Sequence, residues 1–348
     1  MVTATGSIIG EGIIKCLKLA NTVGKEYSYE IISADMRADA AGLYRGHHGV
    51  LIPSPHDGSK YYDSLASVCR KFSVRAIFPG SDEELFPLAK FATSIEKETG
   101  SKVIINPLSA LEIAVDKWKT YELLKARNID CAESCLPENF GGFVEKFDYP
   151  FIVKPRTGHG SQGIHLANDE TEINLALKKI RESGDAPIIQ EYLSGEEAEY
   201  TTGIVVGNNM KDVLSSISMR RILKHGQTYK AFVEDAEQVR RSSERVAIEL
   251  GGRGPVNVQS RLVDDVSKVF EINPRFSASC PIRAVAGINE PDIVFRDQVL
   301  GEKVAPPEYR KLVGMRYWSE IYVPLETFET AKQSGRVGVE HSLLPDYF

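Results

Sequence analysis

GPVNVQSRLVDDVSKVFEINPR, residues 254–275, contains two runs of alternating apolar and polar residues on either side of the pair Asp264–Asp265. Alternation around such a pair predicts two antiparallel strands joined by a tight turn. Successive side chains of a strand point to opposite faces, so Glu271 and Asn273 share one face of the second strand. A turn centred near the second aspartate sets Gln259 of the first strand directly across from Glu271. The stretch therefore predicts three oxygen-bearing side chains on one patch of a hairpin with an apolar back.

The chemistry of this patch suits a hard divalent cation such as Mg²⁺ or Mn²⁺. Such cations prefer oxygen ligands, of which one or two are carboxylates, and phosphate oxygens complete the shell. On the opposite face of the second strand, Phe270 and Ile272 are expected to lie together. Arg275 follows on the same face as Asn273, and an arginine beside a metal site suits recognition of a carboxylate or phosphate. A solvated hairpin face also carries Glu, Gln and Asn without binding anything, so the patch alone leaves both interpretations open.

FIVKPRTGHGSQG, residues 151–163, combines a lysine at the end of a strand with a glycine-rich loop. Gly158, Gly160 and Gly163 let the backbone approach phosphate oxygens and present N–H groups to them. Lys154 supplies a positive charge for the same phosphates. The stretch is not a P-loop, because no Gly-Lys-Ser/Thr sequence opens a helix. On its own, a plain turn is the simpler interpretation.

PIIQEYLSGEEAEY, residues 187–200, is the third informative stretch. Its strand, Ile188–Leu193, presents a backbone edge that can receive a purine. Glu191 and Glu199 can reach an exocyclic amine or ribose hydroxyls. Taken alone, an acidic turn between two strands is again the simpler interpretation.

The arrangement of strands and helices changes after about the first hundred residues. Up to that point apolar strands and helices alternate strictly, which predicts right-handed crossovers and an open parallel sheet. Beyond residue 187 strands follow one another with few helices between them, which predicts antiparallel sheet. The fold class is therefore an α/β domain followed by an α+β region. The expected strands are 1–5, 29–34, 50–52, 75–78, 102–105, 150–154, 163–167, 187–193, 198–206, 213–219, 255–263 and 268–273, and the expected helices run to about residue 23 and over 61–71, 85–99, 108–128 and 171–183.

Bulk composition narrows the class of protein. The 348 residues carry a formal net charge of -6, which argues against a nucleic-acid binder because such domains usually present a basic face. No window approaches the ~18 uninterrupted apolar residues of a membrane span. The five cysteines are scattered and match no zinc spacing, so a reducing cytoplasm is the simplest location. Those cysteines are Cys16, Cys69, Cys131, Cys135 and Cys280.

In their order along the chain, these stretches resemble the ATP-grasp superfamily, and most closely one synthetase unit of the carbamoyl-phosphate synthetase large subunit. The resemblance covers roughly residues 1–300 and includes the pair Asp116-Lys117, the lysine strand with its glycine loop, the hinge strand Gln190–Leu193, and Glu271-Ile272-Asn273-Pro274-Arg275. It implies an ATP-grasp fold with an N-terminal, Rossmann-like parallel-sheet domain. The implied parts are a pre-ATP-grasp domain at 1–107, a small lid subdomain at 108–186, a large subdomain with the metal site at 187–310, and a C-terminal extension at 311–348 that packs on the core.

The resemblance also implies a role for each matching residue. The metal ligands would be Gln259, Glu271 and Asn273, and the catalytic residues Lys154 and Arg275. Gly6, Ser81, Asp82 and Arg283 are candidates for the substrate cleft, although a surface salt bridge explains Arg283 equally well. Asp82, Glu83 and Glu84 could hold an amine, but the N-terminus of a helix favours acidic residues in any case. The ATP-binding set would be Lys117, Lys154, Arg156, Gly158, His159, Gly160, Ser161, Gly163, Gln190, Glu191, Leu193 and Glu199. The basic run Arg220-Arg221-Ile222-Leu223-Lys224 is similar to a stretch that lies beside the nucleotide in biotin carboxylases, but an exposed basic turn explains it equally well.

The implied activity is an ATP- and magnesium-dependent ligase that activates a carboxylate as an acyl phosphate for attack by an amine. Its partners would be small-molecule substrates, and a homodimer is compatible with the resemblance. The chain holds one synthetase unit, and FSASCP, residues 276–281, lacks the Glu-His that follows this motif in biotin carboxylases. A stand-alone carboxylate–amine ligase therefore fits better than a carboxylase.

Two alternatives stay open at this point. An NAD(P)-dependent oxidoreductase is suggested by Gly6, Gly10 and Gly12 after the first strand and by Asp35 at the end of the second. The spacing G-x-x-x-G-x-G departs from G-x-G-x-x-G, which makes that match poor. A non-catalytic nucleotide-binding protein that kept the ATP-grasp fold is the other alternative, although it has no need of a full metal-ligand set.

Overall fold

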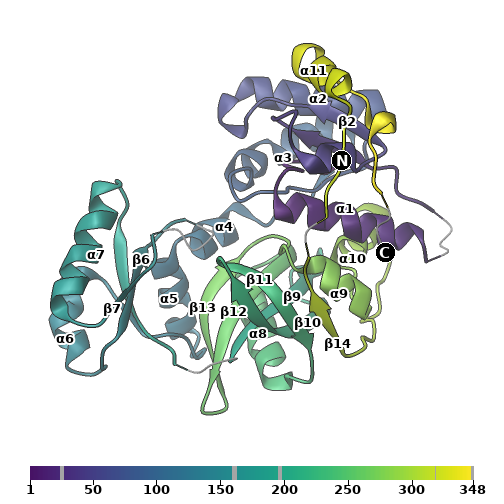
Figure 1. Ribbon diagram of the computed structural model, residues 1–348. Coiled ribbons are helices and arrows are strands. Elements are labelled where there is room, and N and C mark those ends of the chain that lie inside the picture. Colours follow the sequence, from purple (N-terminus) through teal and green to yellow (C-terminus); the bar gives the residue numbers. More distant parts are fainter. Residues whose placement is uncertain (24–26, 159–162, 195–197, 318, 346–348) are drawn as a thin grey trace.

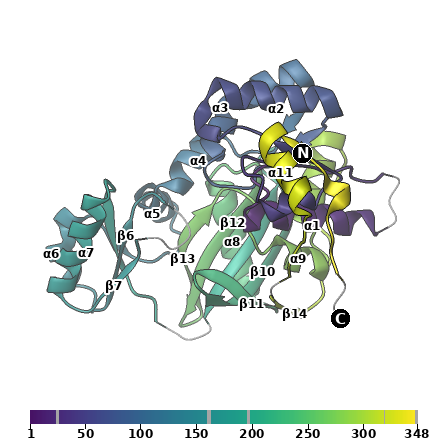
Figure 2. The ribbon, with the colours of Figure 1, turned by 45° about the horizontal axis from the view of Figure 1, so that its top comes forward.

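The computed structural model describes residues 1–23, 27–158, 163–194, 198–317 and 319–345. Three bodies are visible in Figure 1: an N-terminal domain at the top, a small lobe that stands apart on the left, and a large antiparallel sheet in the centre. Figure 2 shows the same separation of the small lobe from another direction. In the described parts of the chain, no helix combines the length and the apolar character needed to cross a membrane.

The N-terminal domain is an α/β unit with parallel strands. Its elements are β1 (Ile32–Asp35), β2 (His48–Leu51), β3 (Ala76–Ile77), β4 (Lys102–Val103), α1 (Ile8–Asn21), α2 (Ser59–Phe72) and α3 (Leu85–Thr99), with 3-10 turns at Ala41–Tyr44 and Pro55–Asp57. β1 pairs in parallel with β2, and β3 with β4. Val2 forms parallel bridges to both Ser33 and Phe78 and so joins the two halves. The predicted strand–helix alternation is confirmed, but the strand expected at 1–5 is reduced to this bridge.

The small lobe is a four-stranded antiparallel sheet covered by helices. Its strands are β5 (Ser134–Cys135), β6 (Phe151–Pro155), β7 (His165–Ala167) and β8 (Pro187–Glu191), in the order β5-β8-β6-β7, and its helices are α6 (Phe140–Val144) and α7 (Glu170–Glu182), with a 3-10 turn at Pro137–Asn139. Phe151 and Val153 of β6 are fully buried against Ile173 and Leu177 of α7. The alternation along β6 therefore fixes the lobe's core and leaves Lys154 pointing to the other face.

Two helices lead into the small lobe, α4 (Leu108–Val115) and α5 (Lys117–Ala126), where the sequence predicted one helix over 108–128. The break falls at Asp116, whose backbone is extended at φ -94° and ψ 109°. Its side chain accepts hydrogen bonds from the N–H groups of Trp118 and Lys119 and so caps the second helix. The prediction of one helix was wrong because an aspartate competes for the backbone donors of a new helix start.

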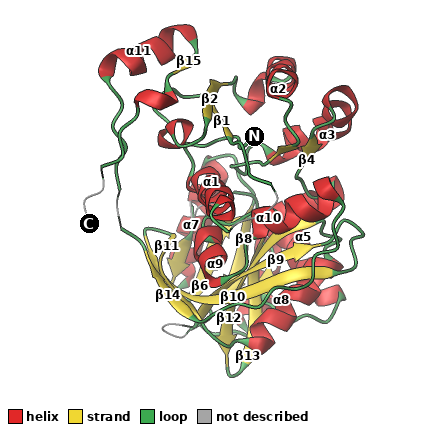
Figure 3. Ribbon diagram, turned by 90° about the vertical axis from the view of Figure 1, so that its right-hand side faces the viewer, coloured by secondary structure: helices red, strands yellow, loops and turns green. Residues whose placement is uncertain are grey.

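The large sheet has six antiparallel strands in the order β13-β12-β9-β10-β11-β14. Its strands are β9 (Glu199–Val206), β10 (Val213–Lys224), β11 (Gln227–Val233), β12 (Gly254–Val263), β13 (Val266–Asn273) and β14 (Leu312–Met315), and its helices are α8 (Glu237–Glu249), α9 (Cys280–Ala286) and α10 (Glu290–Phe295), with a π-helical turn at Arg296–Leu300. The sequence predicted β10 only as far as residue 219, and β11 and α8 were not predicted. α8 packs on one face of the sheet, and α9 and α10 lie between the sheet and α1 (Figure 3).

The C-terminal segment connects the large sheet with the N-terminal domain. β14 is the edge strand beside β11, and the chain then runs through α11 (Leu325–Ser334) to β15 (Arg336–Val337), which pairs antiparallel with β2; a 3-10 turn at Val339–His341 follows (Figure 3). Ile321, Val323 and Val337 pack against Leu43 and Tyr44 of the N-terminal domain. The segment therefore contacts both bodies instead of forming a separate unit.

Candidate functional site

The hairpin of β12 and β13 brings the predicted metal patch together. Gln259 pairs with Glu271, and Asn257 pairs with Asn273 in the antiparallel ladder. Glu271 Oε1 accepts a hydrogen bond from Asn273 Nδ2 at 3.0 Å and a longer one from Gln259 Nε2 at 3.5 Å. The predicted juxtaposition of these three side chains is confirmed.

The turn of this hairpin explains the register. Asp264 and Asp265 both have positive φ, 47° and 60°, as the two central residues of the tightest hairpin turns require. Aspartate tolerates this conformation because its short polar side chain can bond to the local backbone. A two-residue turn leaves one register, and that register sets Gln259 opposite Glu271.

A β-bulge in the hairpin changes the position of Phe270. The ladder shifts between Gln259 and Ser260, so that Ser260 pairs with Val269 and Phe270 is the extra residue. Ile272 is buried in the core, whereas Phe270 is half-buried with its ring centroid 6.0 Å from the Lys154 ammonium. The prediction that Phe270 and Ile272 share one face was wrong, because a bulge re-aims the side chain at the extra position.

Lys154 lies buried across from Glu271. Its side chain is 3% exposed, and Nζ donates a hydrogen bond to Gln190 Oε1 at 2.7 Å. Burial lowers the pKa of the ammonium to about 8, Glu271 raises it, and Lys117 lowers it further. Gln190, predicted to bind ATP, thus orients the lysine, and its amide group is fixed from behind by a hydrogen bond to Ser134 Oγ at 2.9 Å.

Lys117 is a second lysine in the field of the same carboxylate. Burial lowers its pKa, and Glu271 is the largest of the charges that oppose this shift. Lys117 Nζ donates to the carbonyl of Gly158 at 3.0 Å, which joins the start of α5 to the glycine loop. Glu271 therefore faces two lysines from two different elements.

Arg156 is held beside the same loop by the helix cap of α5. Its guanidinium donates to both oxygens of Asp116, at 3.1 and 2.6 Å, and its carbonyl accepts the N–H of Lys117. Burial by itself raises the pKa of Asp116, but the hydrogen bonds of Arg156 and the N–H of Trp118 hold it below the usual value. Asp116 thus places Lys117 and Arg156 together.

The glycine loop begins and ends in backbone conformations that favour glycine. Gly158 has φ 118° and Gly163 has φ 68°. His159, Gly160 and Ser161, predicted to close over phosphate, lie outside the described residues. Of the described ends, Gly158 follows β6 and accepts from Lys117, and Gly163 precedes β7.

The predicted adenine and ribose contacts lie at the junction of the small lobe and the large sheet. Glu191 accepts the N–H of Glu133 at 2.9 Å and the ammonium of Lys268 at 2.9 Å. The carbonyl of Leu193 accepts Arg261 Nη1 at 3.1 Å, and Glu199 accepts Arg261 Nη2 at 3.1 Å. Glu191 and Glu199 are thus oriented by basic residues of the β12–β13 hairpin.

Arg221 is a site residue whose role the sequence left open. It donates to Glu199 Oε1 through Nε at 2.9 Å and to Gln259 Oε1 through Nη2 at 2.6 Å. Its neighbour Arg220 instead pairs with Glu234 and lies over the ring of Phe232. Alternation along β10 therefore separates the two arginines, and Arg221 alone connects the predicted ribose acid with the metal patch.

Arg275 connects the metal patch with the N-terminal domain. Its guanidinium donates to Asn273 Oδ1 at 3.0 Å and to both oxygens of Asp82, at 2.9 and 3.0 Å. Asp82 belongs to the loop between β3 and α3, so the contact crosses from one body to the other. Paired hydrogen bonds between a guanidinium and a carboxylate are strong and directional.

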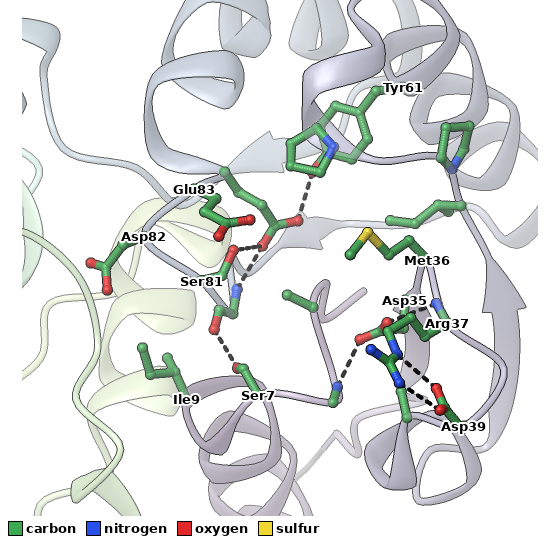
Figure 4. A pocket seen from close by; sticks show the side chains of 18 of the residues that line it. Ser7, Ile9, Asp35, Met36, Arg37, Asp39, Tyr61, Ser81, Asp82 and Glu83 are labelled. Atoms are coloured by element: carbon green, nitrogen blue, oxygen red, sulfur yellow. Dashed lines mark hydrogen bonds and ion pairs between the residues drawn. The ribbon is translucent and has the colours of Figure 1, made fainter. Parts of the chain in front are cut away.

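Asp82 also lines a cavity of about 580 Å³ in the N-terminal domain (Figure 4). Gly6 and Ser81, the other predicted substrate residues of this domain, line it as well. Gly6 donates its N–H to Asp35 Oδ2 at 2.7 Å. The structure thus brings three of the four predicted substrate residues to one cavity that adjoins Arg275.

Arg283 does not lie in a cleft or on the surface. Its side chain is 0% exposed and donates to Glu290 at 2.9 Å, Asn257 at 2.7 Å and Thr201 at 3.0 Å. Burial raises the pKa of Glu290, and the charge of Arg283 opposes this shift. The expectation of a substrate contact or a surface ion pair is corrected: an arginine with three buried partners ties α9 to β9 and β12.

The donor set of the patch suits magnesium, although it is short of carboxylates. Among the described residues, no three His, Cys, Asp or Glu side chains are close enough to one another to hold a metal ion. The patch instead offers one carboxylate, Glu271, beside the side-chain amides of Gln259 and Asn273, whose oxygens accept from Arg221 and Arg275 and keep a second lone pair. Hard cations accept such oxygens and take phosphate oxygens to complete the shell.

Known protein families match both the N-terminal domain and the part of the chain that carries the metal patch. Residues 114–279 match the family model of the ATP-grasp domain, and residues 8–104 match the PylC-like N-terminal domain. The chain contains an ATP-grasp domain preceded by a PylC-like N-terminal domain. These matches do not favour the oxidoreductase alternative.

Curated ATP-grasp relatives are distant and mostly longer. The carbamoyl phosphate synthase large chain of Clostridium botulinum is 28% identical over 267 residues, which are 70% of this chain and 24% of that protein. The chain thus spans about a quarter of the length of this relative. A D-alanine–D-alanine ligase of Pediococcus pentosaceus is 33% identical over 100 residues, which are 28% of each chain.

Solved structures show the same fold over nearly the whole chain. The N5-carboxyaminoimidazole synthetase of Staphylococcus aureus, solved with ADP, has a TM-score of 0.69 at 18% identity and covers 95% of this chain and 84% of its own. The biotin carboxylase domain of Hydrogenobacter thermophilus 2-oxoglutarate carboxylase, solved with MgADP, has a TM-score of 0.69 at 15% identity and covers 93% and 78%. At these identities the likeness establishes the ATP-grasp fold.

Proposed function

We propose that this ATP-grasp protein is a carboxylate–amine ligase that uses ATP to activate a carboxylate as an acyl phosphate. The observation that carries the proposal is the position of Glu271. Its carboxylate lies in contact with Gln259 and Asn273. Burial lowers the pKa of both Lys154 and Lys117, and the charge of Glu271 opposes that shift in each. A metal-type oxygen patch opposed by two lysines is what the terminal phosphates of a nucleotide require.

The nucleotide would lie between the small lobe and the large sheet. Gln190, Glu191 and the backbone of Leu193 would receive the adenine, and Glu199 would accept the ribose hydroxyls. Lys154, Lys117, Arg156 and the loop that starts at Gly158 would hold the phosphates. ADP in the staphylococcal synthetase and MgADP in the biotin carboxylase domain support a nucleotide in this fold.

The metal would be held by the three side chains of the patch. Gln259, Glu271 and Asn273 supply oxygen donors, and Mg²⁺ (or Mn²⁺) bound there would neutralise part of the phosphate charge. Mg²⁺ keeps few protein ligands and completes its octahedron with phosphate and water, so one carboxylate and two amides are sufficient.

The chain's own groups position the reaction without a protein nucleophile. A substrate carboxylate attacks the γ-phosphorus, the bond to the β-phosphate oxygen breaks, and ADP leaves with the electron pair. Lys154 and Lys117 hold the phosphates in line, while Arg275 binds the carboxylate that becomes the acyl phosphate. The amine then forms the C–N bond as phosphate leaves, and its proton passes to a neighbouring carboxylate or water. Positioning and charge stabilisation provide most of the rate in such transfers.

An ADP-release screen tests the proposal. Amino acids and small carboxylates are paired with amines, including ammonia, and the wild type is compared with Glu271→Ala and with the exposed control Glu237→Ala. The proposal expects ADP release that depends on both substrates and is abolished only in Glu271→Ala, with the fold intact. Near-normal ADP production by Glu271→Ala contradicts the metal patch. Nucleotide binding without turnover for any pair would favour a non-catalytic nucleotide-binding protein.

The homodimer and the cytoplasmic location remain predictions. They would be tested by light scattering on the purified chain and by fractionation of the cells that produce it.

A further inference from the structure

The cavity in the N-terminal domain has the size and the walls of a small-molecule site. Its volume of about 580 Å³ falls in the usual range for ligand pockets and far exceeds what ammonia needs. The lining combines apolar side chains, among them Ile9, Met36 and Tyr61, with charged ones. Met36 is 54% exposed although it is apolar, so its side chain is available to cover the body of a ligand.

The charged lining is strongly acidic. Five carboxylates and one guanidinium, Arg37, line the cavity. Arg37 is bound by Asp39 through two hydrogen bonds, at 2.8 and 2.6 Å, so its charge is already balanced within the cavity wall. Asp82 is paired in the same way with Arg275, so five carboxylates face two guanidiniums, and the lining favours a cation over an anion.

Four of the five carboxylates lie at two separate ends, and the fifth, Glu84, is buried and accepts hydrogen bonds from Tyr61 and Gly80. Figure 4 shows Asp82 and Glu83 on one side of the cavity and Asp35 and Asp39 on the other, with the side chain of Met36 between the two groups. Asp35 is fixed in place, because Oδ2 accepts the N–H of Gly6 and Oδ1 accepts the N–H of Arg37. A carboxylate with two such donors still has lone pairs for a ligand's N–H groups.

The N-terminus of α1 borders the same cavity and in general favours an anion. Here its cap is engaged within the protein. Ser7 Oγ accepts the N–H of Gly10 at 2.9 Å and donates to the carbonyl of Gly80 at 2.5 Å. The helix end therefore does not reverse the preference set by the carboxylates.

Only one end of the cavity adjoins the metal patch. Asp82 is bound by Arg275, and Arg275 also donates to Asn273. A ligand group beside Asp82 thus lies next to the place proposed for the activated carboxylate, whereas a group beside Asp35 is remote from it. Glu83 lines the same end of the cavity, and a carboxylate there can accept the proton that an ammonium must lose before it attacks.

We propose that this cavity binds the amine substrate and that this substrate carries a second cationic group, as a diamine or a basic amine does. The reacting amine lies at the Asp82–Glu83 end, and the remote cation lies at the Asp35–Asp39 end. The proposal rests on the ligase function proposed above. It narrows the acceptor from any amine to one with two positive charges separated by an apolar stretch.

Calorimetry on the whole chain saturated with Mg-ADP tests this charge requirement directly. The probes are 1,4-diaminobutane, butylamine and 4-aminobutanoate, which share a chain length and carry a remote group that is positive, neutral or negative; longer homologues of all three follow. At the best length the diamine is expected to bind about tenfold or more tighter than the monoamine, since hydrogen bonds between charged groups contribute that much. The amino acid is expected to bind most weakly. Equal affinities, or tighter binding of the amino acid at every length, overturn the proposal.

Two variants show whether the preference arises in this cavity. Asp39→Asn removes one remote charge and leaves Arg37 unbalanced, so the diamine's advantage over the monoamine is expected to vanish. Asp63→Asn, an exposed change on α2 outside the cavity, is expected to keep it. A full diamine preference in Asp39→Asn overturns the proposal, and a melting temperature for each variant confirms that it is folded.

The two proposals fail in different ways. If the wild type binds Mg-ADP but shows no diamine preference, the ligase function stands and the substrate class is wrong. If Mg-ADP itself does not bind, the ligase function is wrong, and the substrate class falls with it.

Discussion

Arg275 donates to both carboxylate oxygens of Asp82, at 2.9 and 3.0 Å, and so joins the metal patch of the large sheet to the cavity of the N-terminal domain. Each partner is less than one-fifth exposed, which protects the contact from solvent screening. Among the described residues, Arg275 is the only arginine that contacts both Asn273 and a residue lining this cavity, and Asp82 fixes its guanidinium. Its geometry should therefore matter for turnover more than for stability.

Arg275→Lys is expected to lower turnover by roughly 10- to 100-fold, because a lysine cannot form the paired hydrogen bonds and contacts of this kind contribute about 1.5–3 kcal/mol. ADP release with the substrate pair found by screening measures the effect, and Mg-ADP affinity should change far less. Arg70→Ala is the matched control, since Arg70 pairs with Glu98 on an exposed surface. Unchanged turnover in Arg275→Lys would remove Arg275 from the mechanism.

Glu271→Gln keeps the shape of the metal patch and removes its charge. Glu271 is the largest opposing influence on the lowered pKa of both Lys154 and Lys117, so both values should fall further in the variant. We expect the affinity for Mg-ADP to drop by at least about tenfold, because one carboxylate ligand is lost. Thermal shift with and without Mg²⁺ measures it, and an undiminished magnesium-dependent shift would contradict the assignment.

The hairpin at the metal patch could be predicted from sequence because its determinants are local. Alternation fixes the faces, and the Asp264–Asp265 turn fixes the register. The bulge at Phe270 gives no such signal, since one extra residue leaves the apolar pattern of Val269 and Ile272 almost unchanged. The strand faces and the register were predicted because they depend on neighbouring residues in the sequence. The bulge was not, because it depends on one irregular step of the backbone.

The role of Arg221, which the sequence left open, was within reach of sequence reasoning. The alternating pattern continues through β10 and resumes in β11 after His225 and Gly226, whose φ values of 52° and 73° form a tight hairpin turn. Recognising that turn extends β10 beyond residue 219, where Arg220 pairs with Tyr200 and the next residue, Arg221, donates to Glu199. Arg283 is different, because its partners come from β9, β12 and α10, which are distant in sequence.

The lowered pKa of Lys154 predicts how nucleotide binding depends on pH. The folded-state value of about 8 lies below the usual 10.5, so the ammonium loses its proton about when the solution passes pH 8. Affinity for Mg-ADP should therefore weaken as the pH rises from 8 towards 9.5, approaching tenfold per pH unit. Titrations of wild type and Lys154→Met at several pH values test this, and the variant should bind weakly with a flat profile. An equally flat profile in the wild type would contradict a role for the charged lysine.

The lowered pKa of Lys154 has the opposite effect on stability: as the pH rises, nucleotide affinity falls but the free energy of unfolding increases. Between pH 8 and 10.5 the unfolded chain keeps a proton on this lysine that the folded chain has released. The free energy of unfolding therefore receives a contribution from Lys154 that rises with pH over this window and is constant outside it. Comparing urea unfolding of wild type and Lys154→Met at pH 7.5 and 9.5 isolates the contribution, which should raise the wild type relative to the variant at the higher pH.

Gly203 on β9 leaves room for the buried ion pair of Arg283 and Glu290. A Cβ atom at this position would lie 1.9 Å from Glu290 Oε1 and 2.2 Å from Arg283 Nη1, and both side chains are buried with no space to withdraw. Gly203→Ala is expected to destabilise the fold by about 3 kcal/mol or more, because it disrupts a buried charge pair whose separated members are costly.

Gly141 provides the matched control for this substitution. It lies in α6, nothing lies within 4 Å of an added Cβ, and its φ is not positive, so Gly141→Ala should stabilise the fold by about 0.5–1 kcal/mol. Urea unfolding of both variants measures the difference. If Gly203→Ala unfolded at the wild-type denaturant concentration, Arg283 and Glu290 could not be paired beside Gly203, and the buried link from α9 and α10 to the sheet that carries the metal patch would have to be rejected.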